Sequence, residues 1–289
     1  MSKCHIFTGE FSFALNWYAP LIKSNVNDGD VVVSFPLHEM LYRGTIDFHP
    51  LPMEMIKQLP YPSTFGQHIG AYDITPDFVI DYCKNIFPNH QVVLPESLNV
   101  NDIEFSQNPP GRFHHLEPDI SVETEVDNFL SKVNRKSVYV MPKYRVRNKP
   151  EPQNWDIDNW KSMIEDLDKW GFEPITINIQ SLKYEGGTYD GLTNYQYDID
   201  IEDCFGLDKQ SWLLKKTKVS IWGSTGAVNL GFWLNTPTCG IILNPYHERL
   251  HFNWQNTLTD NHKKNLILGV DLSKVTWDDL RYQVKDWLL

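Results

Sequence analysis

Short apolar runs alternate with amphipathic stretches along most of the chain, and this order predicts strands that alternate with helices. The run Val31-Val32-Val33 is apolar at every position, as in a strand that is covered on both faces. Because alternating strands and helices form parallel sheets, we predict an α/β fold. The predicted strands are 5–8, 30–35, 91–94, 137–141, 174–179, 218–222 and 238–243.

Prolines, glycines and capping residues mark where the predicted helices begin and end. Pro20 is expected to bend or end the first helix. Thr75 is the expected N-cap of the second helix, and Asp156 or Asp158 that of the third, which Gly171 ends. The predicted helices cover about 14–21, 78–87, 157–170, 209–216, 227–235 and 277–289.

The charge is distributed unevenly along the chain. The first 130 residues contain 17 acidic and 6 basic residues, so the whole net charge of −11 lies in this part. This asymmetry indicates two domains with different partners. The segment 99–125 is rich in Asn and Pro and has no sustained period, so it is expected to end the first domain. We predict an N-terminal domain at 1–125, a second domain at 126–275 and a C-terminal helix at 276–289, which Thr276 and Asp279 cap and which docks on the protein.

The composition, 41% hydrophobic and 22% charged residues, is that of a globular protein rather than a disordered or fibrous one. No run of eighteen apolar residues and no secretory signal is readable, so we expect a cytoplasmic protein without a membrane span. The four cysteines are far apart and form no C-x-x-C pair. We therefore expect Cys4, Cys83, Cys204 and Cys239 to be buried thiols rather than zinc ligands or disulfides.

Two segments of the second domain are candidates for binding an anion. The predicted strand 137–141 leads into a basic loop at its carboxyl end, where open α/β sheets bind ligands; a solvated basic face is the alternative. The turn Ser224-Thr225-Gly226 lies between a strand and a helix, where backbone N–H groups and the helix dipole attract anions; an ordinary turn is the alternative. The basic residues of the loop are Lys143, Arg145, Arg147 and Lys149.

The order of these pieces resembles GT-B glycosyltransferases, in particular the heptosyltransferase-like enzymes of glycosyltransferase family 9. Three motifs carry the resemblance. The segment 224–230, followed by Thr236-Pro237-Thr238, is similar to the phosphate-binding turn of that family, although Asn229 stands where the family usually has His. Thr8-Gly9-Glu10 is similar to its Gly-Asp step, with Glu10 in place of the catalytic Asp. The third motif is the basic loop and the helix after it, with Trp155, Asp158, Trp160, Ile164, Leu167 and Gly171.

The resemblance implies two Rossmann-like domains that face each other across a cleft. It also implies an inverting transfer of a hexosyl or heptosyl group from a nucleotide diphosphate to the hydroxyl of a glycan or another acceptor, with no metal or cofactor. Glu10 would take the proton of that hydroxyl, unless it only caps the following helix. The donor diphosphate would be held by Lys143, Arg145, Arg147, Ser224, Thr225 and Gly226. The nucleoside would contact His247 and Glu248. Independently of the resemblance, His114 and His115 could contact the acceptor or be an ordinary exposed pair, and we favour the second because neither neighbour supplies a third ligand.

Other functions compete with this one. The sequence His247-Glu248-Arg249-Leu250-His251 matches the H-E-x-x-H motif of zinc hydrolases, but it has no apolar helical stripe around it. Asp198-Ile199-Asp200 resembles a D-x-D metal motif, and we interpret it as a solvated face or a helix start. A non-catalytic protein of the same fold that binds a nucleotide or a glycan is a further alternative. A nucleic-acid acceptor is disfavoured by the acidity of the first domain.

Overall fold

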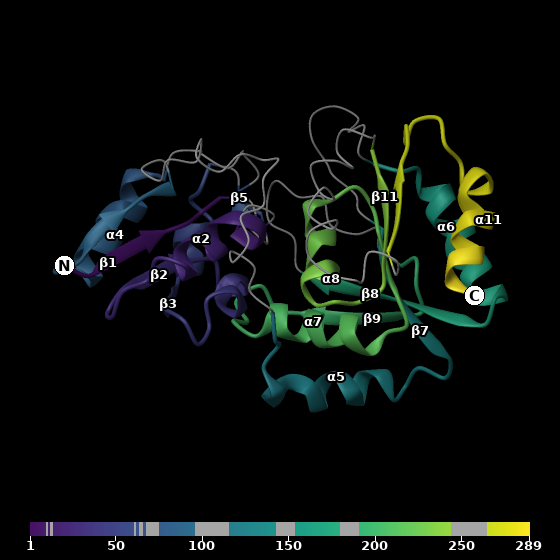
Figure 1. The fold of residues 1–289 in the computed structure, drawn as a ribbon, viewed down its shortest axis with the longest axis horizontal. Coiled ribbons are helices and arrows are strands. Elements are labelled where there is room, and N and C mark those ends of the chain that lie inside the picture. The colour runs from purple at the N-terminus through teal and green to yellow at the C-terminus, as the bar shows by residue number, and fades with distance from the viewer. Residues whose placement is uncertain are drawn as a thin grey trace. The chain divides into compact units, whose positions relative to one another are not determined.

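The computed structural model describes residues 1–9, 11, 14–60, 62–63, 66–67, 75–95, 116–142, 154–179, 191–243 and 265–289. The chain divides into two compact units. The first contains Met1–Glu117, Gln180–Tyr184 and Asp200–Leu207, and the second contains Pro118–Ile179, Glu185–Ile199 and Asp208–Leu289. Each unit contains a parallel sheet with helices, so the predicted α/β class is confirmed (Figure 1). The cleft predicted between two domains stays a prediction.

The first unit is built on a four-stranded parallel sheet in the order β3-β2-β1-β6. Cys4 and Ile6 of β1 and Val33 of β2 share a core with Val79 and Cys83 of α4. The strands are β1 (Lys3–Ile6), β2 (Val31–Ser34), β3 (Asp47–Pro50) and β6 (Gln91–Val93), with an antiparallel pair β4 (Pro62–Ser63) and β5 (Gly66–Gln67). The helices are α2 (Ala19–Lys23), α3 (Met53–Ile56) and α4 (Asp77–Ile86), with a π-helical turn Ala14–Tyr18 and a 3-10 helix Pro36–Leu41.

Two details of the helix prediction in the first unit have different outcomes. The helical stretch changes type just before Pro20, since the π-helical turn ends at Tyr18 and α2 begins at Ala19, with Pro20 in its first turn. Thr75 is not the N-cap of α4. That position is held by Pro76, in extended conformation and without a side-chain cap.

A buried histidine in β1 is expected to make the stability of the first unit depend on pH. The Nε2 atom of His5 lies 3.7 Å from Oδ2 of Asp30, and neither ring nitrogen has a hydrogen-bond partner among the described residues. Burial lowers the pKa of His5 below 6.5, and the opposing effect of Asp30 is smaller. The unfolded chain therefore binds this proton more readily, so stability is present above pH 6.5 and falls as the pH decreases below it.

The measurement is the free energy of unfolding in urea at pH 7.5 and 5.5. We expect the His5→Gln protein to lose less stability over this interval than the wild type, by up to about 1 kcal/mol. An equal loss in both proteins would contradict the assignment to His5.

The second unit is built on a six-stranded parallel sheet in the order β12-β11-β10-β7-β8-β9. Its strands are β7 (Lys136–Met141), β8 (Phe172–Ile179), β9 (Tyr195–Ile199), β10 (Ser220–Trp222), β11 (Thr238–Ile242) and β12 (Leu266–Gly269). Its helices are α5 (Glu123–Leu130), α6 (Ile157–Lys169), α7 (Gly206–Lys216), α8 (Asn229–Trp233) and α11 (Trp277–Leu288), with 3-10 helices Ile120–Val122 and Gly226–Val228.

Alternate residues of β7 are buried on opposite faces of this sheet. Val138 and Val140 belong to the core that α6 and α11 complete, and Figure 1 shows these two helices side by side on one face. Tyr139 lies on the other face, where its hydroxyl accepts a hydrogen bond from Gln210 of α7 at 2.8 Å. Because both faces are covered, the three residues in the middle of β7, Val138–Val140, are all buried, whereas Lys136 and Ser137 at its start are not.

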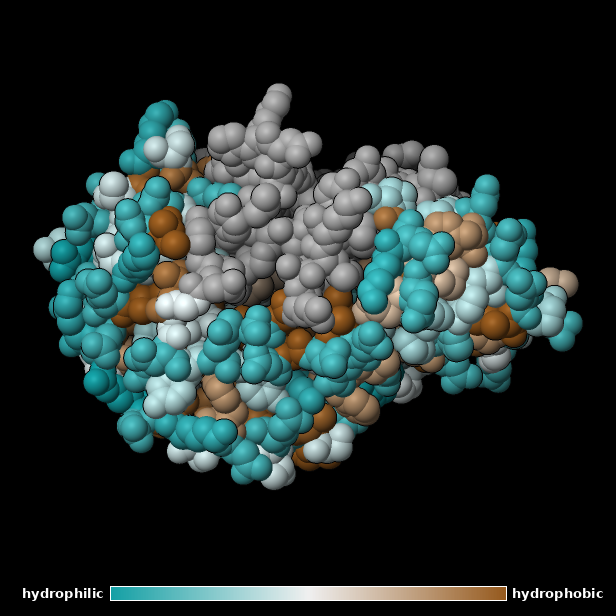
Figure 2. Space-filling model, turned by 180° about the vertical axis from the view of Figure 1, so that it is seen from behind, coloured by the Kyte–Doolittle hydropathy of each residue, from teal (hydrophilic) through white to brown (hydrophobic). Residues whose placement is uncertain are grey.

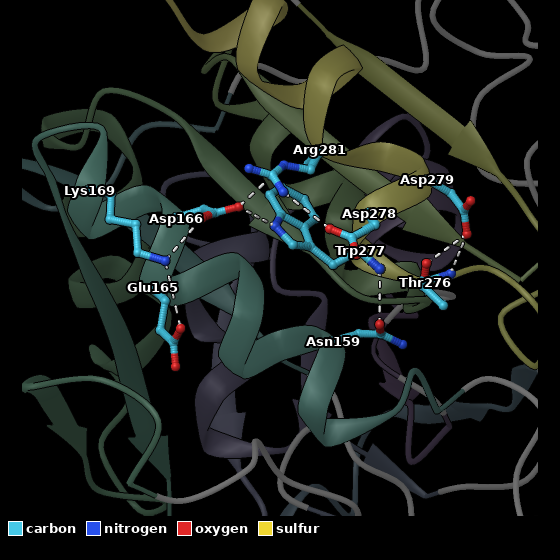
Figure 3. A network of polar contacts seen from close by, with 9 residues as sticks. All are labelled: Asn159, Glu165, Asp166, Lys169, Thr276, Trp277, Asp278, Asp279 and Arg281. Atoms are coloured by element: carbon cyan, nitrogen blue, oxygen red, sulfur yellow. Dashed lines mark hydrogen bonds and ion pairs between the residues drawn. The ribbon is translucent and has the colours of Figure 1, made fainter.

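The C-terminal helix α11 is fixed to α6 by a polar network within the hydrophobic contact (Figure 3). Trp277 Nε1 donates to Asp166 at 2.8 Å, and its backbone N–H donates to Asn159 at 2.9 Å. The capping box of Thr276 and Asp279 is present as predicted. The predicted docking of this helix on the protein is therefore confirmed.

Other predictions for the second unit have mixed outcomes. Asp156 caps α6 and Gly171, with φ of +86°, follows its end, as expected. The single helix predicted at 227–235 is instead a 3-10 turn followed by α8, which ends at Trp233. Asp198 is exposed on β9, which fits the predicted solvated face and not a helix start, and it accepts a hydrogen bond from Asn178 at 2.7 Å.

The described surface shows hydrophilic residues over most of the face seen in Figure 2, with hydrophobic residues in separate patches. Within the described ranges, no helix combines the length and apolarity needed to cross a membrane. Three cysteines are buried as predicted, whereas Cys204 is half-buried. Burial raises the pKa of Cys239 to about 12, so this thiol stays protonated.

Candidate functional site

The turn after β10 is held to the neighbouring strands through its backbone and one hydroxyl. The N–H of Gly223 donates to the carbonyl of Met141 at 3.0 Å, and the N–H of Leu243 donates to Oγ of Ser224 at 3.2 Å. Ser224 is 3% exposed. Its hydroxyl therefore fixes the ends of β10 and β11 relative to each other.

Thr225 and Gly226 begin the helical segment that follows. Oγ1 of Thr225 accepts a hydrogen bond from the N–H of Ala227 at 3.3 Å and so acts as N-cap of the 3-10 turn. Gly226 is buried. Of the three predicted phosphate-binding residues in this turn, Ser224 and Thr225 thus also have a structural role, which gives the turn a fixed geometry.

The carboxyl ends of β7, β10 and β11 lie at one edge of the second sheet because these neighbours are parallel. The described chain leaves this edge at Pro142, directly before the predicted basic loop, and at Leu243, directly before 244–264. The structure therefore brings together the Ser224–Gly226 turn and the residues from which the basic loop starts. This edge is where open α/β sheets bind ligands.

Close packing behind the turn depends on Gly231 of α8. A Cβ atom at this position would clash with Oγ1 of Thr238, and it would lie 3.3 Å from Oγ of Ser220. Both hydroxyls are buried and are hydrogen-bonded to each other at 3.1 Å. We expect Gly231→Ala to lower the free energy of unfolding by about 1–3 kcal/mol through overpacking.

Urea unfolding of a double-mutant cycle tests this explanation. Thr238→Ala removes the atom that the new methyl group would strike, so Gly231→Ala should cost less in that background. If its cost is the same in both backgrounds, the clash with Thr238 is not the cause.

A serine–histidine pair that the sequence did not indicate lies at the carboxyl edge of the first sheet. Oγ of Ser34 donates to the carbonyl of Phe7 at 2.8 Å and contacts Nδ1 of His38 at 2.8 Å. Because a hydroxyl has one proton, Nδ1 of His38 must carry the hydrogen that it donates to Ser34. The buried ring of His38 also packs near Phe11. These contacts fix the chain just before Gly9.

The other predicted site residues are all in segments that the structure does not describe. Glu10, His114, His115, Lys143, Arg145, Arg147, His247 and Glu248 lie outside the described residues, as does His251 of the H-E-x-x-H motif. Their roles stay predictions. In the part of the chain that the structure describes, no three His, Cys, Asp or Glu side chains come together as metal ligands.

Solved structures of similar fold align with the full length of the chain or nearly so. Escherichia coli ADP-heptose lps heptosyltransferase II aligns with 100% of this chain and 98% of its own, with a TM-score of 0.59 and 10% identity. The chain has the GT-B fold of the heptosyltransferases. The resemblance expected from the three sequence motifs is thereby confirmed at the level of the fold.

Two further heptosyltransferase-like structures give the same result. E. coli heptosyltransferase WaaC, solved with ADP, aligns with 99% of this chain and 100% of its own, with a TM-score of 0.53 and 11% identity. The glycosyl transferase family 9 protein of Veillonella parvula aligns with 99% and 97%, with a TM-score of 0.54 and 10% identity. Neither a protein-family model nor a curated protein sequence matches the chain.

Proposed function

We propose that the protein is a glycosyltransferase that moves a sugar from a nucleotide diphosphate to an acceptor hydroxyl, without a metal and with inversion at the anomeric carbon. The observation that carries this proposal is the turn Ser224–Gly226 beside the start of the basic loop, at the ligand-binding edge of a heptosyltransferase-like sheet. Because WaaC was solved with ADP, an adenine nucleotide is the first donor to test.

The proposed reaction needs one group that acts on the acceptor hydroxyl and other groups that act on the leaving diphosphate. Glu10 takes the proton of the acceptor hydroxyl while that oxygen forms a bond to the anomeric carbon. The bond between this carbon and the diphosphate oxygen breaks, and the nucleoside diphosphate leaves. Lys143, Arg145 and Arg147 stabilise the negative charge that develops on it.

The remaining residues bind the donor or the acceptor and take no part in the chemical step. The backbone N–H groups of the turn Ser224–Gly226 add hydrogen bonds to the diphosphate. His247 and Glu248 contact the base or ribose, and His114 and His115 contact the acceptor, which is a glycan or another hydroxyl-bearing molecule. The acidity of the first 130 residues disfavours nucleic acid in that role.

Thermal unfolding with ADP, UDP, GDP and their sugar conjugates tests donor binding. A ligand at 100 times its dissociation constant stabilises the folded protein by about 2.7 kcal/mol, so the melting temperature should rise with at least one nucleotide. Arg147→Ala should weaken the binding of this nucleotide by tenfold or more. Arg135→Ala is the matched control, because Arg135 precedes β7 and pairs with Asp168 at the surface.

A second pair of variants separates the hydroxyl of Thr225 from its methyl group. Thr225→Val should weaken nucleotide binding, whereas Thr225→Ser keeps the hydroxyl and should bind nearly as well as the wild type. If no nucleotide raises the melting temperature, the proposed function is contradicted. Stoichiometric zinc in the purified protein would also contradict it, and would favour hydrolysis through His247, Glu248 and His251.

A further inference from the structure

A groove of about 460 Å³ lies between α5 and β9 in the second unit and is open to solvent. Its size is within the range of small-molecule sites. β9 is the last strand of the described sheet, and β7 and β8 separate it from β10. At about 4.8 Å per strand spacing, the groove lies roughly 14 Å from the strand that leads into the Ser224–Gly226 turn. It is therefore a different site from the proposed donor site.

The α5 wall of the groove is one face of that helix. Glu125, Asn128 and Phe129 line the groove at the i, i+3, i+4 spacing of residues that share a helical face, and Lys132, in the turn after α5, lines it as well. The opposite wall is the edge of β9 and the residue before it. Half of the N–H and C=O groups of an edge strand point away from its sheet and add donors and acceptors to such a wall.

The lining combines aromatic rings with carboxamide groups. Phe129 and Tyr195 are half-buried, so part of each ring is accessible. Asn128, Asn194 and Gln196 also line the groove, and their side-chain amides have no hydrogen-bond partner among the described residues. A pyranose ring needs both kinds of group. Its C–H face packs on the negative face of an aromatic ring, and its hydroxyls pair with amides, each of which donates and accepts.

A second set of contacts holds the aromatic part of the groove in place. The hydroxyl of Tyr197 donates to Oε1 of Glu125 at 2.7 Å, and Oε2 of Glu125 pairs with Lys209 of α7 at 2.9 Å. The rings of Phe129 and Tyr197 meet edge to face, with centroids 5.0 Å apart. A platform that is fixed before binding loses less entropy when a ligand binds.

The charges of the lining argue against an anionic ligand. Two lining residues are acidic, Glu125 and Asp198, and one is basic, Lys132. We propose that this groove binds a neutral oligosaccharide, at a site separate from the donor site. This inference does not depend on the proposed transferase activity, because a protein of this fold without catalysis would bind the same ligand here.

The competing occupant of an edge strand is a peptide that pairs with its backbone. Several features of this edge oppose such pairing. β9 has five residues, and a short edge strand with an exposed charge such as Asp198 is how proteins limit strand addition. The unpaired side-chain amides along the groove are not needed by a ligand that binds through backbone hydrogen bonds alone.

The test is a titration of the full chain with chitotriose, cellotriose and maltotriose, followed in 1H–15N NMR spectra without nucleotide. We expect at least one trisaccharide to shift the signals of residues in α5 and β9. Tyr195→Ala should weaken its binding by about tenfold to a hundredfold, because it removes one of the accessible aromatic rings of the groove. Asn128→Ala, an exposed helical position, should weaken it about threefold to tenfold.

Matched controls come from residues of the same type away from the groove. Tyr282→Ala removes a tyrosine that is 71% exposed on α11, and Asn85→Ala removes an exposed asparagine on α4; both variants should bind as the wild type does. No shift with any of the three sugars, or shifts that Asn128→Ala and Tyr195→Ala leave unchanged, would overturn the proposal. The second outcome would favour backbone pairing or another surface, and neither outcome bears on nucleotide binding.

Discussion

Replacing Asp166 with Ala is expected to lower the free energy of unfolding by about 3 kcal/mol. This carboxylate is 7% exposed and accepts a hydrogen bond from Nε1 of Trp277, which is 2% exposed. It also lies 3.6 Å from Nε of Arg281 and 3.4 Å from Nζ of Lys169. Its removal leaves a buried indole N–H without an acceptor and two cations without their shared anion, at the contact of α6 and α11.

The measurement is urea unfolding followed by tryptophan fluorescence. The control is Glu165→Ala, since Glu165 is the adjacent residue and approaches the same lysine at 3.8 Å but is 70% exposed. An exposed pair of this kind contributes less than about 1 kcal/mol. If both variants lose the same stability, the buried hydrogen bond to Trp277 does not hold α11 in place.

Replacing Glu10 with Gln is expected to lower the rate constant of sugar transfer by about 10²–10⁴-fold. The amide has the same shape as the carboxylate but cannot accept the proton of the acceptor hydroxyl. The measurement is release of the nucleoside diphosphate at saturating donor and acceptor. Donor binding, measured by thermal shift, should be unchanged, because Glu10 is assigned to the acceptor's proton and not to the diphosphate.

Glu54→Gln is the matched control for this substitution. Glu54 is an exposed glutamate of the first unit, on α3, and has no assigned part in the reaction. Activity that survives Glu10→Gln would show that this carboxylate caps the following helix or has no role. It would then favour a different base.

The strands that the sequence pattern identified are mostly those with two covered faces. Among the described strands five were missed, and all of them are at sheet edges: β3 in the first sheet, β9 and β12 in the second, and the two-stranded pair β4 and β5. The edge strands β3 and β9 are partly exposed and contain polar residues, so their hydrophobic period is weak, whereas β12 (Leu266–Gly269) is apolar and was within reach of the pattern. Asp198 lies on the exposed side of an edge strand, which agrees with its interpretation as a solvated face and not with a helix start.

The candidate site was predictable only where one segment contains the whole signal. Ser224, Thr225 and Gly226 are consecutive, and the strand, turn and helix around them can be read locally. Ser34 and His38 are four residues apart, but the hydrogen bond from Ser34 to the carbonyl of Phe7, 27 residues away in sequence, depends on how β1 and β2 align. The one local sign of that pair was that Ser34 and His38 are polar positions in the otherwise apolar segment that starts at Val31.

The strand order of the second sheet also constrains how this unit assembles during synthesis. β7, β8 and β9 are neighbours in the sheet and leave the ribosome before β10, which pairs with the other side of β7. That side of β7 therefore has no partner strand until residues 220–222 have been made. A chaperone that recognises extended apolar segments has this interval in which to bind Val138 and Val140 on the nascent chain.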